Sequence, residues 1–374
     1  MIYLDYAADT PVNHEVLDSF CNISKKYYGN PNAKHHIGAQ AKKIIAESTE
    51  AIKEILGCSG MEVVYTSGAS EANNLAIKGI ARAYRGKGQH IISTCLEHAS
   101  VSGTLTWLQS QGYEIDLVMI QKDGSVDLDH LKTLLRSDTI LVSVGYVDSE
   151  LGICQPIAAI GEILMNYPNC YFHVDATQAV GKIPVSFINI DLVTFSPHKF
   201  FGLKGTGVLL RNETVLLEPL IHGGSSTSVY RSGTPDTAGA AATAAALKIC
   251  YETSAERYQL VKAKNLMLRN ALANYPLVTI NSTARSLPHF LNVSVKNVKA
   301  MAFQSALNDF DVCVSTKSAC STDITPSRAV YTVTGNRNLA KCSWRISICH
   351  LTAETEIQDF LKIFNTCYNN LTQK

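Results

Sequence analysis

Hydrophobic positions in the first two thirds of the chain fall into short runs rich in β-branched residues, separated by longer stretches with helical spacing. Seven runs are apolar enough to form strands: residues 62–67, 90–94, 114–120, 139–144, 171–176, 191–196 and 207–211. Amphipathic segments such as "AQAKKIIAESTEAIKEIL" and "PIAAIGEILMNY" lie between many of them. Because strands that alternate with helices form parallel sheets covered by helices, the pattern predicts an α/β domain with a mostly parallel seven-stranded sheet.

The pattern changes after about residue 250. A long polar helix, "SAERYQLVKAKNLMLRNALAN", precedes short strands near "HFLNVSV", "DVCVS" and "SWRISIC" and a closing helix. Apolar residues recur at helical spacing in that last helix: Ile357, Phe360, Leu361, Phe364 and Leu371. This spacing indicates a second, smaller core of α+β type. Since no Pro-, Gly- or Ser-rich linker separates the two parts, we expect them to pack together.

Composition and charge restrict the class of partner. Hydrophobic residues make up 46% of the 374 positions and charged residues 17%, which is typical of a well-buried globular protein. The net charge of +1 gives no electrostatic signature of nucleic-acid or membrane-surface binding. No run of 18 apolar residues is present, and the start "MIYLDYAADTPVNHEV" lacks the pattern of a signal peptide. We therefore expect a cytoplasmic protein that acts on a small ligand.

The 11 cysteines are scattered and form no C-x-x-C pair, so the sequence predicts no zinc, haem or dithiol site, and no other metal site. An odd number without a signal peptide also argues against a disulfide framework. We expect most of these cysteines to be small buried hydrophobes, while any one could be a reactive thiol.

Polar residues follow several of the predicted strands, where ligands bind in open α/β sheets. The first strand is followed by "TSGASEANNLAIKGIA", a glycine turn rich in hydroxyls that opens an amphipathic helix. The N-terminus of such a helix can bind a phosphate, although the hydroxyls could equally serve only as N-caps. His98 in "LEHASV" follows the second strand, where an imidazole could stack on a ligand ring or could be purely structural.

A carboxylate and an amine follow two neighbouring strands. Asp175 ends "YFHVD", with Gln178 one turn later, and Lys199 comes after the next strand. Beside a phosphate cradle these groups suit pyridoxal phosphate (PLP), because lysine forms a Schiff base with its aldehyde and aspartate pairs with its protonated pyridine nitrogen. A surface lysine is the alternative. Two further phosphate donors, Ser196 and His198, and the tight turn of "GLKGTG" favour the cofactor.

Motifs along nearly the whole chain together resemble those of cysteine desulfurases of the class V aminotransferase family, which are fold-type I PLP enzymes. The stretches are "YLDYAADTPV", "GNPNAKHHIGAQA", "TSGASEANNLAIKG", "EHASV", "HVDATQAVGKIPV", "FSPHKFFGLKGTG", "HGG", "YRSGTP" and "KSACSTDITPS". The resemblance implies a homodimer. It also implies a large PLP-binding domain over residues 15–250, and a small domain of residues 1–14 and 251–374 that carries the catalytic-cysteine loop.

The matching motifs imply that Lys199 is the Schiff-base lysine, that Asp175 pairs with the pyridinium nitrogen, that Gln178 donates to the ring oxygen and that His98 stacks on the ring and handles a proton. They imply that the phosphate is bound by Ser70, Ser196 and His198, together with Thr234 of the other subunit. Arg345 would bind the substrate carboxylate, and Cys320 would be the nucleophile. The guanidinium of Arg345 suits a carboxylate because it can bind both oxygens. Cys320 in "KSACST" resembles the branch whose cysteine lies on a long mobile loop.

The family chemistry implied is removal of sulfur from L-cysteine, which gives L-alanine and a persulfide on Cys320 for transfer to an acceptor protein or reductant. A thiolate must attack the sulfur, so the loop would approach the cationic groups of the site. Iron–sulfur cluster assembly, tRNA thiolation and cofactor synthesis all stay open as pathways. Docking to an iron–sulfur scaffold is not implied, since the sequence ends at "NNLTQK" where scaffold-binding relatives continue.

Several positions depart from the family pattern. Ser149 stands where the family has an asparagine beside the ring oxygen and substrate, Pro197 and Lys317 replace residues of small size, and Cys349-His350 replace a Gly-Arg pair. Four alternatives therefore stay open: a related PLP aminotransferase, a selenocysteine lyase, a weakly active regulatory paralogue, and a hydrolase. The hydrolase would use Ser70 as nucleophile, because "GASEA" nearly matches the nucleophile-elbow motif.

Overall fold

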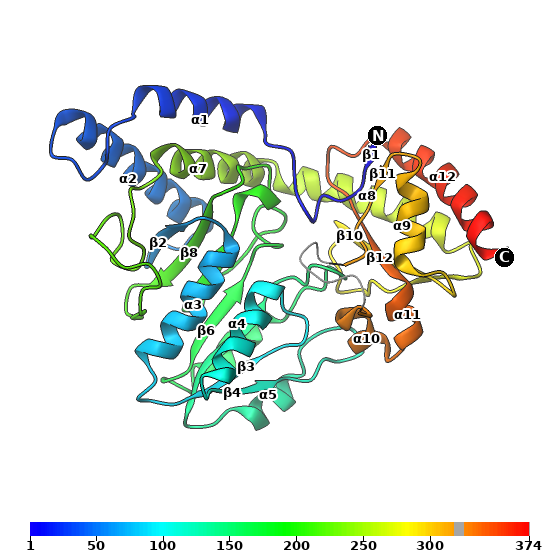
Figure 1. Ribbon diagram of the computed structural model, residues 1–374, viewed down its shortest axis with the longest axis horizontal. Coiled ribbons are helices and arrows are strands. Elements are labelled where there is room, and N and C mark those ends of the chain that lie inside the picture. The colour runs from blue at the N-terminus through cyan, green and yellow to red at the C-terminus, as the bar shows by residue number, and fades with distance from the viewer. Residues whose placement is uncertain (318–324, 374) are drawn as a thin grey trace.

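The structure is a computed structural model that describes residues 1–317 and 325–373. It has a larger lobe built around one sheet and a smaller lobe that carries both chain termini (Figure 1). Cys320 lies outside the described residues. None of the helices in the described ranges combines the length and the apolar character that crossing a membrane demands.

The sheet of the larger lobe has seven strands in the order β2-β8-β7-β6-β5-β3-β4. The strands are β2 (Met61–Thr66), β3 (His90–Ser93), β4 (Glu114–Leu117), β5 (Thr139–Gly145), β6 (Tyr171–Asp175), β7 (Leu192–Phe195) and β8 (Gly207–Asn212). Strand β8 runs antiparallel to both its neighbours, and the other pairs are parallel. The predicted mostly parallel sheet is confirmed.

The strands are apolar on both faces because two separate cores cover the sheet. Successive residues point to opposite faces of a strand, so Val63 and Val64 of β2 belong to different cores, as do Ile91 and Ile92 of β3. One core includes residues of α1 (His14–Lys26), α2 (His36–Leu56), α5 (Leu128–Leu134), α6 (Ile157–Leu164) and α7 (Thr237–Glu252). The other includes α3 (Ala69–Ala83) and α4 (Ala99–Ser110). The helices therefore form a layer on each face of the sheet.

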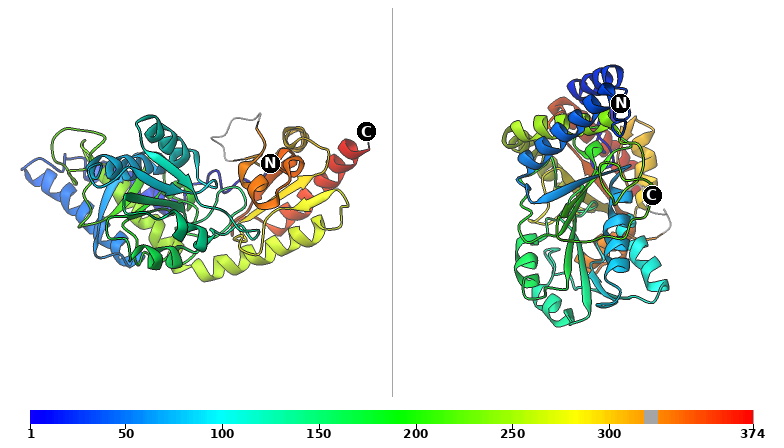
Figure 2. Two further views of the ribbon diagram at one scale, coloured as in Figure 1. Left: turned by 90° about the horizontal axis from the view of Figure 1, so that it is seen from below. Right: turned by 90° about the vertical axis from the view of Figure 1, so that its left-hand side faces the viewer.

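Helix α8 (Ser254–Leu272) leads from the larger lobe along the smaller one, as Figure 2 shows. The smaller lobe contains the antiparallel sheet β12-β10-β9 and the parallel pair β1-β11. Its elements are β1 (Ile2–Tyr3), β9 (Val278–Ile280), β10 (Phe290–Val295), α9 (Ala300–Asn308), β11 (Val312–Cys313), α10 (Arg328–Thr334), α11 (Arg337–Cys342), β12 (Ser343–Ser347) and α12 (Glu354–Thr372).

A separate hydrophobic core fills the smaller lobe. Trp344 of β12 stacks on Phe303 of α9, with ring centroids 5.2 Å apart, and Phe364 of α12 packs against both. Leu4 belongs to the same core, which joins the first residues of the chain to its last third. On this ground we propose the division into residues 15–250 and residues 1–14 with 251–374 as two domains.

Candidate active site

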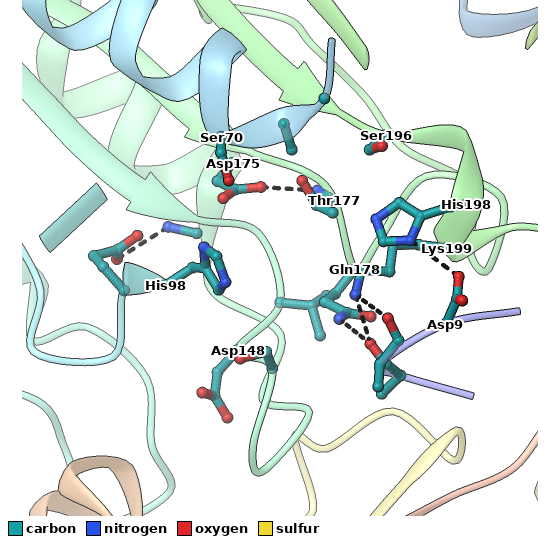
Figure 3. Close-up of a pocket in the computed structure, with 18 of the residues that line it drawn as sticks. Asp9, Ser70, His98, Asp148, Asp175, Thr177, Gln178, Ser196, His198 and Lys199 are labelled. Carbon is teal, nitrogen blue, oxygen red and sulfur yellow. Dashed lines mark hydrogen bonds and ion pairs between the residues drawn. The ribbon is translucent and has the colours of Figure 1, made fainter. Parts of the chain in front are cut away.

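A cavity of about 630 Å³ opens beyond the carboxyl ends of the parallel strands (Figure 3). Its wall contains most of the predicted site residues: Ser70, His98, Ser149, Asp175, Gln178, Ser196, His198, Lys199 and Arg345. The sheet brings them together because each follows a strand at the same edge, while Arg345 comes from β12 of the smaller lobe. Thr234 is exposed and lies outside this wall, and the predicted nucleophile Cys320 lies outside the described residues.

Asp175 is the last residue of β6, and its carboxylate is held on both oxygens. Oδ1 accepts a hydrogen bond from the backbone N–H of Thr177 at 3.0 Å. Oδ2 accepts one from Nδ2 of Asn73 at 2.8 Å. The residue is 8% exposed, so a carboxylate with a fixed orientation faces the cavity. Such a group can pair with a cationic ring nitrogen.

Lys199 ends the short 3₁₀ helix Pro197–Lys199 that follows β7. Its Nζ donates to the carbonyl oxygens of Ala8 at 2.6 Å and Ala7 at 3.0 Å. Gln178 donates from Nε2 to the same Ala7 carbonyl at 2.9 Å. Figure 3 shows the lysine, the glutamine and this N-terminal segment meeting at one side of the cavity. The N-terminal residues therefore hold the Lys199 amine at the cavity wall.

The N-terminus of α3 forms another part of the wall. Its N-cap is Gly68, which offers no side chain to the first N–H groups of the helix. An uncapped helix start favours an anion through these N–H groups and the helix dipole. Across from it, the hydroxyl of Ser196 donates to the Thr206 carbonyl at 2.7 Å, and Nδ1 of His198 lies 3.1 Å from Oδ1 of Asp9.

His98 is the N-cap of α4, and its ring faces the cavity (Figure 3). Nδ1 accepts from the backbone N–H of Ser100 at 3.2 Å and lies 2.9 Å from the hydroxyl of the same serine. Burial lowers the pKa of His98; the Asp175 carboxylate opposes this effect, and the Lys199 cation adds a smaller lowering contribution. The imidazole is therefore neutral near pH 7 and carries its proton on Nε2.

Arg345 is 1% exposed and is fixed by two partners. Its Nη2 donates to Oδ1 of Asp5 at 2.7 Å, and its Nη1 donates to the carbonyl oxygen of Ser149 at 2.5 Å. Ser149, the departure from the family pattern, thus contributes its backbone to the orientation of the arginine. The guanidinium lies where it can meet a carboxylate within the cavity.

Two buried polar atoms in this wall have no hydrogen-bond partner within the described part of the protein: Oγ1 of Thr177 and Nε of Arg345. Buried polar groups are normally satisfied, so these atoms indicate places for a ligand. PLP and an amino acid have groups that suit this wall. The aldehyde suits the Lys199 amine, the ring nitrogen suits the Asp175 carboxylate, the phosphate suits the start of α3, and the amino-acid carboxylate suits Arg345. The residues present therefore fit this cofactor.

Several polar residues at the site carry no role in the sequence-based prediction. Glu97 accepts at Oε1 from the Thr94 hydroxyl at 2.7 Å and from Gly145 N–H at 3.1 Å. Burial raises its pKa to about 8, with smaller contributions from Asp175 and Asp148. Asn73 and Asp5, which hold Asp175 and Arg345, were also missed. A polar residue in the apolar stripe of α3 is the one local signal, because Asn73, Ile77 and Ile80 share helical spacing and are all buried.

Comparison with known proteins connects this geometry to one family. The model of the family "Aminotransferase class-V" matches residues 2–360. A curated relative named cysteine desulfurase IscS, from Dictyoglomus turgidum, is 35% identical over 99% of this chain and 95% of its own length. Among solved structures, a NifS-like protein superposes with a TM-score of 0.91 at 31% identity, covering 100% of both chains. The structure described as SspA in complex with cysteine has a TM-score of 0.83 at 28% identity, covering 94% of this chain and 100% of its own.

Proposed function

The chain belongs to the aminotransferase class-V family, and on that premise we propose that it is a PLP-dependent cysteine desulfurase that converts L-cysteine to L-alanine and passes the sulfur on. A relative named cysteine desulfurase matches 99% of this chain, and one similar structure is described as a complex with cysteine. The observation that carries the proposal is the position of Asp175 and Lys199, which line one cavity together with the uncapped start of α3.

The cofactor would be held by residues already in the cavity wall. Its phosphate would bind at the start of α3, with Ser70, Ser196 and His198, and its ring nitrogen would pair with Asp175. Gln178 would donate to the ring oxygen, His98 would stack on the ring, and Lys199 would bind the aldehyde. When bound, PLP supplies the electron sink that weakens the bonds at the substrate Cα.

The remaining steps fall to the chain's own side chains. Arg345 would bind the substrate carboxylate through its unpaired Nε and its neighbouring nitrogens. Lys199 would accept the Cα proton once the substrate has replaced it, and neutral His98 would donate a proton from Nε2. Cys320, as thiolate, would form a bond to the substrate sulfur while the bond from carbon to sulfur breaks. The electron pair of the broken bond stays on the substrate carbon, which takes up a proton, so the products are alanine and a persulfide on Cys320.

We further propose that the active unit is a homodimer in which Thr234 reaches the phosphate site of the partner subunit. The support is that Thr234 is exposed and lies outside the cavity of its own chain. The acceptor of the sulfur is a thiol or reductant of unspecified identity.

The purified protein loaded with PLP tests the proposal when it is given L-cysteine and a thiol reductant. We expect alanine and sulfide in equal amounts, and mass spectrometry should find one added sulfur atom on Cys320. Cys320→Ser should keep the visible absorbance of the cofactor and lose sulfide release, whereas Cys21→Ser, at an exposed thiol on α1, should lose neither. Keto acid in place of alanine would instead identify an aminotransferase.

A further inference from the structure

The side-chain amide of Asn73 lies behind the cavity wall, fully buried on α3, and contacts three functional elements at once. Its Nδ2 donates to Oδ2 of Asp175 and to Oγ of Ser100, both at 2.8 Å. Its Oδ1 accepts from the hydroxyl of Thr194 on β7. The amide nitrogen has only two hydrogens, and both are used. If the amide were flipped, its oxygen would face the Asp175 carboxylate, and neither group could donate a hydrogen bond. The surroundings therefore permit only one orientation of the Asn73 amide.

The hydrogen bonds behind Asn73 all run in one direction. Thr194 gives its hydroxyl proton to Asn73 and therefore accepts from Nε2 of His173, 3.3 Å away. His173 must then carry its proton on Nε2, which leaves Nδ1 to accept from the Ser143 hydroxyl at 2.8 Å. Burial lowers the pKa of His173 to about 4, against a smaller opposing effect of Asp175. The ring is thus neutral at physiological pH, and the direction of the bonds is preserved.

A second branch leads from Asn73 to the catalytic imidazole. Ser100 accepts from Asn73 with its hydroxyl oxygen, so its own proton is directed to Nδ1 of His98, 2.9 Å away. The backbone N–H of Ser100 donates to the same Nδ1 at 3.2 Å. Since both contacts require an unprotonated Nδ1, the proton of neutral His98 is fixed on Nε2.

We propose that Asn73 is a positioning residue that sets two properties of the active site together: the orientation of the Asp175 carboxylate and the Nε2–H tautomer of His98. Thr194 and His173 act through Asn73, because they fix the orientation of its amide. This inference rests on the proposed function, in which Asp175 keeps the ring nitrogen of PLP protonated and His98 handles a proton. A residue with a purely structural role would stabilise α3 against the sheet without affecting either property.

The first test uses PLP labelled with ¹⁵N in its ring, bound to the wild-type protein and to variants and observed by NMR. Asn73→Leu replaces the amide with an apolar side chain of similar size and removes the donor to Oδ2 of Asp175. A buried carboxylate that loses a donor binds a proton more readily, so Asp175 then competes with the ring nitrogen for its proton. We expect the wild-type ring nitrogen to be protonated and the N73L ring signal to move toward the unprotonated shift. With L-cysteine, kcat should fall roughly 10- to 100-fold with little change in KM, because Arg345 is untouched.

Matched variants separate this role from a loss of stability. Thr194→Val removes the hydroxyl without a change of shape and should shift the ring signal in the same direction, whereas Thr194→Ser should restore it. Asn265→Leu makes the same change at another buried asparagine, whose amide holds the carbonyls of Pro288 and Phe290. It should lower stability and leave the ring nitrogen protonated. An unchanged ring signal in folded N73L would overturn the proposal.

The second test reads histidine ¹⁵N shifts of the wild-type protein without substrate, with His98 and His173 assigned from His98→Gln and His173→Gln. Both rings should show a protonated Nε2 and an unprotonated Nδ1, and N73L should weaken this preference at His98, where only the backbone N–H of Ser100 still fixes it. A protonated Nδ1 at either ring in the wild-type protein contradicts the chain of hydrogen bonds. Because this test needs no turnover, it decides the inference even if the protein fails to release sulfur from cysteine, which would refute the proposed function alone.

Discussion

Asp5 and Arg345 form an ion pair across almost the whole length of the sequence, with 2.7 Å between Oδ1 and Nη2. Their side chains are 17% and 2% exposed, so the guanidinium depends on this partner for its charge balance. Ser315 donates to the other carboxylate oxygen at 2.8 Å, which fixes Asp5 as well. Arg345, for which we propose a role in binding the substrate carboxylate, is thus held by the first residues of the chain.

Asp5→Asn should leave the Arg345 guanidinium buried without its counter-charge. We expect the free energy of unfolding to fall by about 3–5 kcal/mol, and KM for L-cysteine to rise as the arginine loses its orientation. Urea denaturation and steady-state kinetics measure the two effects. The control Asp359→Asn breaks an exposed pair with Lys362 and should cost less than about 1 kcal/mol. Equal losses in both variants would contradict the role of Asp5.

Glu97→Gln should stabilise the protein increasingly as the pH rises. The fold keeps Glu97 protonated up to its pKa of about 8, whereas the unfolded chain ionises near the ordinary value of 4.5. Between these values the folded state binds more protons, so the wild-type free energy of unfolding falls with rising pH, by up to about 1.4 kcal/mol per unit. Glutamine can accept the same two hydrogen bonds and removes this slope.

Urea unfolding of the wild-type protein and E97Q at pH 5 and pH 8 measures this difference. The stability gain of E97Q should be larger at pH 8. Glu47→Gln, at an exposed pair with Lys43, should show the same stability difference from wild type at both pH values. A gain for E97Q that does not depend on pH would show that Glu97 is ionised in the folded protein.

Thr177→Val should affect cofactor binding without loss of stability. The Thr177 hydroxyl is buried without a partner among the described residues, so valine of the same shape should leave the unfolding free energy of the cofactor-free protein unchanged or raise it by about 1 kcal/mol. If the hydroxyl binds PLP, the dissociation constant should rise by about fivefold. Fluorescence titration with PLP measures it. A less stable cofactor-free variant would mean that the hydroxyl serves the fold.

Gly181→Ala should destabilise the larger lobe. Gly181 has φ of 76°, and a Cβ there would lie 2.4 Å from Cβ of the buried Phe200, the neighbour of Lys199. Backbone strain and overpacking together should cost about 2–5 kcal/mol and weaken PLP binding. Gly205→Ala meets open space at a φ of 75°, so it should cost only the strain, about 1–2 kcal/mol. Urea denaturation measures the free energy of unfolding of both variants, and the difference between their losses is the cost of the contact with Phe200.

Local sequence was sufficient for the strands and for the residues that follow them. Residues 191–196 were predicted and β7 is Leu192–Phe195, because a strand covered on both faces needs a continuous apolar run. The prediction was too long at 114–120, where β4 ends at Leu117. This strand is the edge of the sheet and pairs on one side only, so its apolar run extends beyond the ladder.

Local sequence did not identify Asp5 and Asn73, the residues that hold Arg345 and Asp175 in place. Asp5 meets Arg345 only when the first residues of the chain pack beside β12 in the smaller lobe, and no local pattern links positions so distant. Asn73 stands in a hydroxyl-rich helix start, where a polar residue usually caps the helix or faces water. Its burial depends on how α3 packs over Asp175 and Thr194. Sequence motifs therefore predict the groups that react, and the tertiary structure shows which residues orient them.

The pairing of β1 with β11 also determines how late in translation the smaller lobe can form. Ile2 and Tyr3 emerge first, but their partners Val312 and Cys313 are translated more than 300 residues later. Ala7 and Ala8, which hold the Lys199 amine, belong to the same early segment. A nascent chain that has already built the large sheet still lacks a closed pocket. The backbone segment that holds the Lys199 amine is therefore fixed only late in the synthesis of the chain.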